Sequence, residues 1–196
     1  MLKGKCKYCG AKIHIHHLIV EIVTPLVFIA LFWKFAPDLV LFAKYAILFA
    51  FLIPIFFIDL YHRLILDKLT IPMFIIGLGF ALLPNTDIGI VNALATGLGI
   101  LLLMLVIAWL FEKVRHKEGM GGGDIKLLAA MSTFLGFMNI SFILIFASII
   151  AIVSTVVIFR PKDKLIPYGP FLAVGAFIWV MIGSSFLEWY FNLILR

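Results

Sequence analysis

Two aspartates stand out because each lies next to a long apolar run, where a carboxylate costs free energy. Asp59 ends the run FLIPIFFID, and Asp124 follows the glycine-rich stretch GMGGG. An ionised carboxylate can act as general base toward water while a protonated one acts as general acid, and two neighbouring carboxylates share one proton because they do not readily both ionise. The pair therefore has the residue types needed to hydrolyse a peptide bond without a metal.

Each aspartate also has a simpler interpretation. An aspartate at a helix N-terminus is a common cap that stabilises by about 1 kcal/mol, which would suit Asp124. Asp59 could be a boundary residue whose carboxylate reaches the polar interface. Ionisable residues in membrane segments are nevertheless candidates for function. Spacing and topology alone leave the catalytic and the structural interpretations evenly balanced.

The elements that carry the two aspartates are expected to be membrane helices. Of the 196 residues, 64% are hydrophobic and 13% are charged, whereas soluble proteins average about half and about a quarter. The long runs do not alternate as the strands of a membrane barrel do. About 20 residues cross a bilayer, and the sequence predicts an all-α polytopic bundle of about seven transmembrane helices. The apolar runs are 18–33, 39–58, 69–83, 88–111, 125–137, 140–159 and 171–187.

The distribution of lysine and arginine predicts the orientation of the bundle. With seven spans, thirteen of the 16 basic residues fall on the side of the N-terminus, which is therefore expected to be cytoplasmic. Both aspartates then lie at the cytoplasmic boundary, whereas Asp87 and Lys44 belong to the opposite side, where we expect Asp87 to be solvated. The net charge of +6 suits anionic lipid and does not indicate nucleic acid.

The chain is expected to have two parts, a short cytosolic head at 1–17 and a membrane domain at 18–196. Two glycines of the membrane domain, Gly121 and Gly123, are expected to shape the site around Asp124. Glycine leaves room for an extended substrate and permits a positive φ for a sharp entry into the following helix. Nothing in the sequence specifies an oligomeric state.

Four segments resemble, in order, those of the type IV prepilin peptidases, a family of membrane aspartyl proteases. GMGGGDIKLLAA is similar to the second catalytic motif of this family, with Gly121, Gly123 and Asp124 as its G-x-G-D. IDLYHRLILDKLTIP resembles the first motif, GKCKYCGAKI the cytosolic Cys-x-x-Cys segment, and IPYGPFLAVGA the approach to the last span. Together the segments cover nearly the whole chain.

The resemblance implies a membrane aspartic endopeptidase that removes the basic leader of prepilins or pseudopilins at the cytoplasmic face of the inner membrane. It assigns Asp59, rather than Asp67, as the first catalytic aspartate. Lys126 matches the lysine of the family's G-D-x-K pattern and is expected near the site. The basic leader requires acidic groups close by, for which the candidates are Glu112, Glu118, Asp67 and Asp163.

The sequence departs from the family pattern at three points. Leu66 stands where the family usually has a proline before the residue that matches Asp67. Many members also have a further N-terminal span and a first Cys-x-x-Cys, which are not in this sequence. Those members methylate the new N-terminal amine with S-adenosylmethionine, an activity associated with the N-terminal region. The notable shortness of that region here makes S-adenosylmethionine an unexpected cofactor.

A metal site in the head is a separate question. Two thiolates and two imidazoles would complete a tetrahedral zinc site, and Cys6, Cys9, His14 and His16 are the candidate ligands. A cytoplasmic location makes a disulfide between the cysteines unlikely to form. The alternative is that the histidines are interfacial residues and the cysteines bind no metal. We expect proteolysis itself to need no cofactor.

Two other classes of function remain open on the residues alone. In a proton- or cation-coupled transporter, Asp59 and Asp124 would be relay groups. A transporter should carry polar groups near mid-span and broken helices in matching halves, whereas here the acids lie at the boundary, although Pro25 and Pro54 could break helices. A catalytically silent assembly protein is the third interpretation, and the presence of both aspartates argues against it.

Overall fold

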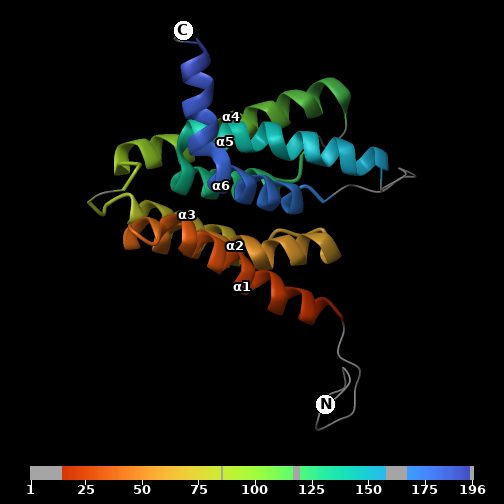
Figure 1. The fold of residues 1–196 in the computed structure, drawn as a ribbon. Helices are drawn as coiled ribbons and strands as arrows, with labels where there is room; N and C mark the ends of the chain where they lie inside the picture. The colour runs from red at the N-terminus through yellow and green to blue at the C-terminus, as the bar shows by residue number, and fades with distance from the viewer. Residues whose placement is uncertain (1–14, 85, 117–119, 158–166, 195–196) are drawn as a thin grey trace.

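The computed structural model describes residues 15–84, 86–116, 120–157 and 167–194. Throughout these residues the regular structure is helical, with no strand, which confirms the all-α prediction (Figure 1). The helices are α1 (Ile15–Phe35), α2 (Leu39–His62), α3 (Asp67–Phe80), α4 (Ile90–Arg115), α5 (Gly122–Val157) and α6 (Gly169–Ile194).

Four helices, α1, α2, α4 and α5, are long and apolar enough to cross a membrane. The chain is therefore a multi-pass membrane protein. The expected count of seven spans is not confirmed. The 14 residues of α3 reach about 21 Å at 1.5 Å per residue, which is shorter than the hydrocarbon core of about 30 Å. The apolar run 125–137 and the described part of the next run, 140–157, both lie in α5.

A break inside α5 separates its two apolar runs. Gly136 has φ 74° and ψ 171°, which is not helical. This region of backbone space is open almost exclusively to glycine. A Cβ at Gly136 would also lie 3.1 Å from Cδ1 of Ile88. In Figure 1 the second half of α5 runs back along the bundle from this break, so the boundary between the two runs is a reversal of chain direction.

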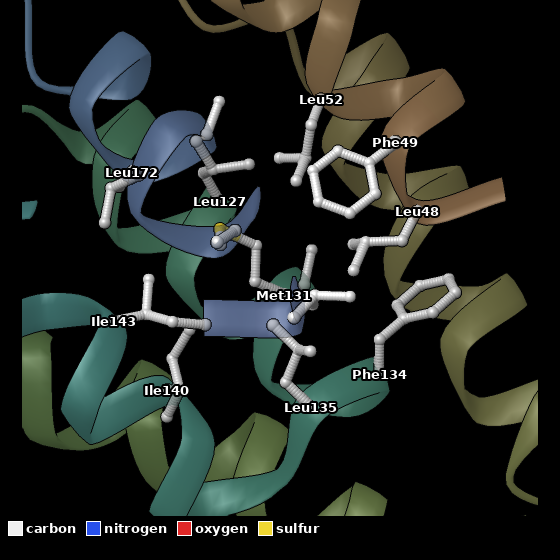
Figure 2. Close-up of a cluster of buried hydrophobic side chains, with 14 of the residues drawn as sticks. Leu48, Phe49, Leu52, Leu127, Met131, Phe134, Leu135, Ile140, Ile143 and Leu172 are labelled. Atoms are coloured by element: carbon white, nitrogen blue, oxygen red, sulfur yellow. The ribbon is translucent and has the colours of Figure 1, made fainter. Parts of the chain in front are cut away.

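The helices pack around a core that α5 dominates. α5 contacts α4, α6 and α3, and α2 contacts α6, α3 and α1. Figure 2 shows Met131 of α5 surrounded by side chains of α2, α6 and both halves of α5. Leu48 and Leu52 of α2 and Leu127 of α5 are fully buried there. Burial of such side chains stabilises by about 1.5–3 kcal/mol each.

One end of the bundle carries the elements that matter for the site. The connection from α2 to α3, the start of α5 and the start of α6 meet there, on the right in Figure 1. The connections from α1 to α2 and from α3 to α4 lie at the opposite end. Paired antiparallel helices thus bring Asp59, at the end of α2, and Asp124, at the start of α5, to the same end, as the topology predicted.

The opposite end holds an ion pair that was not expected from the sequence. Asp87 is exposed, as expected of a solvated charge, but it also forms an ion pair with Lys44 of α2, whose side chain is 2% exposed. The hydroxyl of Tyr45 also donates to Oδ2 of Asp87 at 3.2 Å. A buried ammonium requires such a partner because its desolvation otherwise costs several kcal/mol. The pair therefore ties α2 to the connection before α4.

Candidate active site

Asp59 lies in the last turn of α2 and is 4% exposed. α2 ends at His62, and its C-cap Arg63 has a left-handed backbone with φ 52° and donates its N–H to the carbonyl of Asp59 at 2.9 Å. The Asp59 side chain accepts a hydrogen bond at Oδ2 from the N–H of Gly169, 2.9 Å away. Gly169 is the first residue of α6. A backbone donor from a distant segment therefore satisfies the buried carboxyl.

Glycine at position 169 leaves room for the contact with Asp59 as it stands in the structure. A Cβ built on Gly169 would lie 2.7 Å from Oδ2 of Asp59 and 3.3 Å from its Cγ. Gly169 is itself buried, and Pro170 follows it as the second residue of α6. A proline early in a helix is well suited because the N–H it lacks would be unpaired there. The dipeptide Gly169-Pro170 therefore begins α6 and lets the N–H of Gly169 donate to Asp59.

Asp124 lies in the first turn of α5 and is half-buried. The glycines before it do not have the positive φ that was expected from the sequence. In the part of the chain that the structure describes, Gly136 is the glycine with a positive φ, and Gly121 and Gly123 have none. α5 therefore begins without a glycine in the left-handed backbone conformation.

The structure gives Gly123 a packing role. A Cβ on Gly123 would lie 2.8 Å from Cβ of Ile65 and 3.5 Å from its carbonyl oxygen. Ile65 belongs to the short connection between α2 and α3, so the missing side chain lets the start of α5 approach the end of α2. Gly121 has a different neighbour, since its Cβ would lie 3.2 Å from Oδ2 of Asp124.

Lys126 of α5 forms an ion pair with Asp67, at the start of α3, on the surface of the bundle. Its Nζ donates to both carboxylate oxygens of Asp67 at 2.8 Å, and the side chains are 49% and 53% exposed. Exposed ion pairs contribute at most about 1 kcal/mol. Asp67, the first residue of α3, is therefore engaged with Lys126 and is not among the residues that line the cavity with Asp59.

Asp59 and Asp124 line one cavity of about 600 Å³ at this end of the bundle. Side chains of α4 form an apolar wall, and the segment before α6 closes another side. The remaining lining residues are Arg63, Ile107, Ala108, Phe111, Met120, Gly121, Pro167 and Tyr168. A cavity of this size admits a short stretch of polypeptide. Two carboxylates within it can supply the acid and the base for hydrolysis.

Tyr168 lines this cavity next to Gly169. Its hydroxyl forms a hydrogen bond with Oγ of Ser148 in α5 at 3.0 Å. Burial raises the pKa of the Tyr168 hydroxyl. The hydrogen bond with Ser148 lowers this pKa in part, and the charge of Asp124 adds to the increase. The hydroxyl consequently stays protonated at neutral pH, and the bond to Ser148 holds the segment before α6 against α5.

Three features of the site were not named from the sequence. Arg63 and Tyr168 line the cavity, and Gly169 bonds to Asp59. The resemblance of IPYGP to a family segment pointed to Tyr168 and Gly169, but it assigned them no contact. A hydrogen bond made by a backbone amide has no side-chain signature, so this contact could not be predicted from the residue pattern.

Of the four predicted zinc ligands, the structure describes only His16. Cys6, Cys9 and His14 lie outside the described residues. His16, at the start of α1, contacts Tyr61 near the end of α2, with ring centroids 4.3 Å apart and its Nδ1 paired with the Tyr61 hydroxyl. Within the described ranges no group of three potential ligands gathers. The zinc site stays a prediction.

Comparisons with known proteins identify the family of this chain. Residues 46–156 match the type IV leader peptidase family, and residues 1–35 match the bacterial N-terminal domain that accompanies this peptidase. The first match covers both aspartates and more than half of the chain. The protein belongs to the type IV leader peptidase family.

Several relatives that share one name match almost the whole chain. Proteins called prepilin leader peptidase/N-methyltransferase are 33% identical in Dichelobacter nodosus, over 94% of this chain and 64% of the relative. The identity is 32% in Aeromonas salmonicida strain A449, over 99% and 67%, and 33% in Legionella pneumophila, over 97% and 67%. The chain thus spans about two thirds of the length of these relatives. No solved structure matches the chain significantly.

Proposed function

We propose that the chain is an aspartic endopeptidase of the inner membrane that removes the basic leader of prepilins or pseudopilins. In this proposal Asp59 and Asp124 form the catalytic pair. The observation that carries it is the shared cavity of about 600 Å³, which receives both aspartates from helices that are distant in sequence. Membership of the leader peptidase family and the names of the relatives support the substrate class.

The cavity suits a substrate that is cleaved just before a hydrophobic helix. Ile107, Ala108 and Phe111 of α4 give it an apolar wall. An apolar segment of the substrate gains about 25 cal/mol per Å² of surface buried there. Glu112 follows Phe111 on the exposed surface of α4 and is placed to attract the basic leader. The leader would lie outside the bilayer, and the helix within it.

We propose that the end of the bundle with the cavity faces the cytoplasm, and that the N-terminus does so too. Basic residues gather at this end, where Arg63, Lys68, Arg115 and Lys126 terminate or begin helices. The positive-inside rule assigns such an end to the cytoplasm. If the two halves of α5 are separate crossings, there are seven helical segments, as the sequence predicted. We also propose residues 1–17 as a head distinct from the membrane domain.

We propose that proteolysis by this chain requires no cofactor. The pair of carboxylates supplies both proton transfers, so zinc at Cys6, Cys9, His14 and His16 would serve the head and not the cleavage step. We further expect S-adenosylmethionine not to be a substrate of the 196-residue chain. The mass of the cleaved product after incubation with this donor checks the expectation, and a gain of one methyl group would contradict it.

A transporter is the weaker proposal for this site. A proton relay needs polar groups connected along the bundle. The buried core between the cavity and the Lys44–Asp87 pair is mostly apolar, with Leu52, Ile55 and Met131 among its members. Its buried polar side chains in the described helices are the uncharged Thr70, Ser132 and Thr133, and the hydroxyls of Ser132 and Thr133 donate to carbonyls of their own helix.

The proposal is tested by offering the purified protein a panel of prepilin-like substrates in detergent or liposomes. Each substrate has a basic leader, a cleavage point and a hydrophobic helix, and matched controls carry an acidic leader or a helix interrupted by charges. We expect one cut just before the helix in the intact substrates and much slower cleavage of both controls. Absence of any cut in the whole panel would contradict the proposed function.

A further inference from the structure

The two aspartates of the cavity have different surroundings. Oδ2 of Asp59 accepts the N–H of Gly169 at 2.9 Å. In the described part of the chain, no hydrogen-bond donor reaches the carboxyl of Asp124, and the nearby Tyr168 hydroxyl is paired with Ser148. This asymmetry bears on how the two carboxyls divide their roles.

The Gly169 amide favours a negative charge on Asp59. The first N–H groups of a helix have no partner inside the helix and carry part of the positive end of its dipole. Hydrogen bonds from such groups to an ionised carboxylate are stronger than those to a neutral carboxyl. Asp124 lies at the start of α5 but shares the cavity with this carboxylate, so a proton on Asp124 removes the repulsion between like charges.

We propose that Asp59 is the resting carboxylate and general base, that Asp124 is the protonated general acid, and that Gly169 is the positioning residue that fixes this division. The inference rests on the proposed function, because it assigns roles within the same pair. Gly169 acts through its backbone amide, and its missing side chain is what lets the amide reach Asp59.

The assignment gives a balanced proton cycle. Water attacks the scissile carbonyl carbon while Oδ1 of Asp59, which the Gly169 amide leaves free, takes one of its protons. Asp124 gives its proton to the carbonyl oxygen, which produces a neutral gem-diol. Asp59 then passes its proton to the leaving nitrogen as the C–N bond breaks, and Asp124 recovers a proton from one hydroxyl of the gem-diol. Both residues return to their resting states.

The role of Gly169 is tested by comparing two alanine variants of α6. In Gly169→Ala the new Cβ would lie 2.7 Å from Oδ2 of Asp59, whereas in the control Gly175→Ala the new Cβ meets Ala147 at an ordinary 3.4 Å. A misplacement of about 1 Å costs about 100-fold in rate. We expect kcat of Gly169→Ala to fall about 100-fold with KM within about threefold, and Gly175→Ala to resemble the wild type.

The division of roles is tested by residual cleavage in Asp59→Asn and Asp124→Asn, both nearly isosteric and suited to the same fold. An asparagine at 124 can still donate a hydrogen bond to the carbonyl oxygen, but an asparagine at 59 cannot take a proton from water. We expect both variants to lose several orders of magnitude in rate, with Asp124→Asn retaining about tenfold more activity than Asp59→Asn.

Two results would overturn the inference while the wild type still cleaves. One is a kcat for Gly169→Ala equal to that of Gly175→Ala, and the other is residual activity in Asp59→Asn equal to or greater than that in Asp124→Asn. If Gly169→Ala does not accumulate in membranes, the asparagine pair decides alone. Failure of the wild type to cleave any prepilin-like substrate would instead contradict the proposed function.

Discussion

Replacing Gly123 by alanine should impair the enzyme, whereas the same change at Gly122 should not. The two residues are adjacent at the start of α5, yet the space around them differs. A Cβ at Gly123 would lie 2.8 Å from Cβ of Ile65, and a Cβ at Gly122 would meet nothing within 4 Å. Neither glycine has a positive φ, so backbone strain does not separate the variants.

The expected magnitudes follow from this geometry. Carbon atoms normally approach to about 3.5–4.0 Å, so alanine at 123 has to displace either α5 or Ile65. Ile65 cannot rotate its own Cβ away, and Asp67 two residues later is paired with Lys126 of α5. Overpacking of this kind costs about 1–3 kcal/mol, and the helix preference of alanine over glycine returns up to about 1 kcal/mol. The net loss for Gly123→Ala is about 0–3 kcal/mol.

Catalysis should respond more than stability does. Ile65 lies between Asp59 and α3, so a shift of about 1 Å between α5 and this connection also separates Asp59 from Asp124. Such a misplacement costs about 100-fold in rate. We expect kcat/KM of Gly123→Ala to fall about 100-fold, while Gly122→Ala stays within about threefold of the wild type and unfolds at the same or a slightly higher temperature.

The assay combines cleavage kinetics on one prepilin-like substrate with thermal unfolding of each purified variant in the same detergent. Equal losses of kcat/KM in Gly122→Ala and Gly123→Ala would refute the packing argument, because they would mean that the glycines keep space for the substrate. Full activity of Gly123→Ala would refute it as well, since the contact with Ile65 would then not limit the position of Asp124.

Two further predictions concern the opposite end of the bundle and the head. Asp87→Asn should destabilise the protein by about 3–5 kcal/mol because it leaves Lys44 buried without a charged partner. Lys44→Met should cost less in the same unfolding measurement, since Asp87 is 37% exposed and can turn to water; equal costs would contradict this. Cleavage should persist with a chelator and in the double variant Cys6→Ser, Cys9→Ser, and metal analysis of the purified protein tests separately for zinc. Loss of cleavage in an inserted protein would contradict a metal-free mechanism.

The large-scale arrangement of the site could be predicted from the sequence because it depends on topology. The apolar runs marked the helices, and the alternation of direction brought Asp59 and Asp124 to one end. The same runs distinguished the two halves of α5, although the backbone of Gly136 that separates them is visible only in the structure. Hydropathy did not fix how many segments cross the membrane, since α3 is shorter than a bilayer requires.

The details that failed to follow from the sequence depend on contacts between distant segments. Gly123 was expected to provide substrate space or a positive φ, but its environment is set by Ile65, far away in sequence. The ion pair of Asp87 was not expected because its partner Lys44 lies on a helix distant in sequence. The amide of Gly169 has no side-chain signature at all. In each case the residue type marked the position as noteworthy, but the residue that it contacts could not be predicted from the sequence.

The central claim is that Asp59 and Asp124 together perform the cleavage, and the most direct measurement compares three isosteric variants with the wild type on one prepilin-like substrate. Asp59→Asn and Asp124→Asn should each lower kcat by several orders of magnitude while remaining folded and inserted. Asp67→Asn is the matched control, because Asp67 is paired with Lys126 outside the cavity and should be dispensable for the chemistry. Substantial cleavage by Asp59→Asn or Asp124→Asn, or an inactive Asp67→Asn beside an active Asp59→Asn, would contradict the assignment.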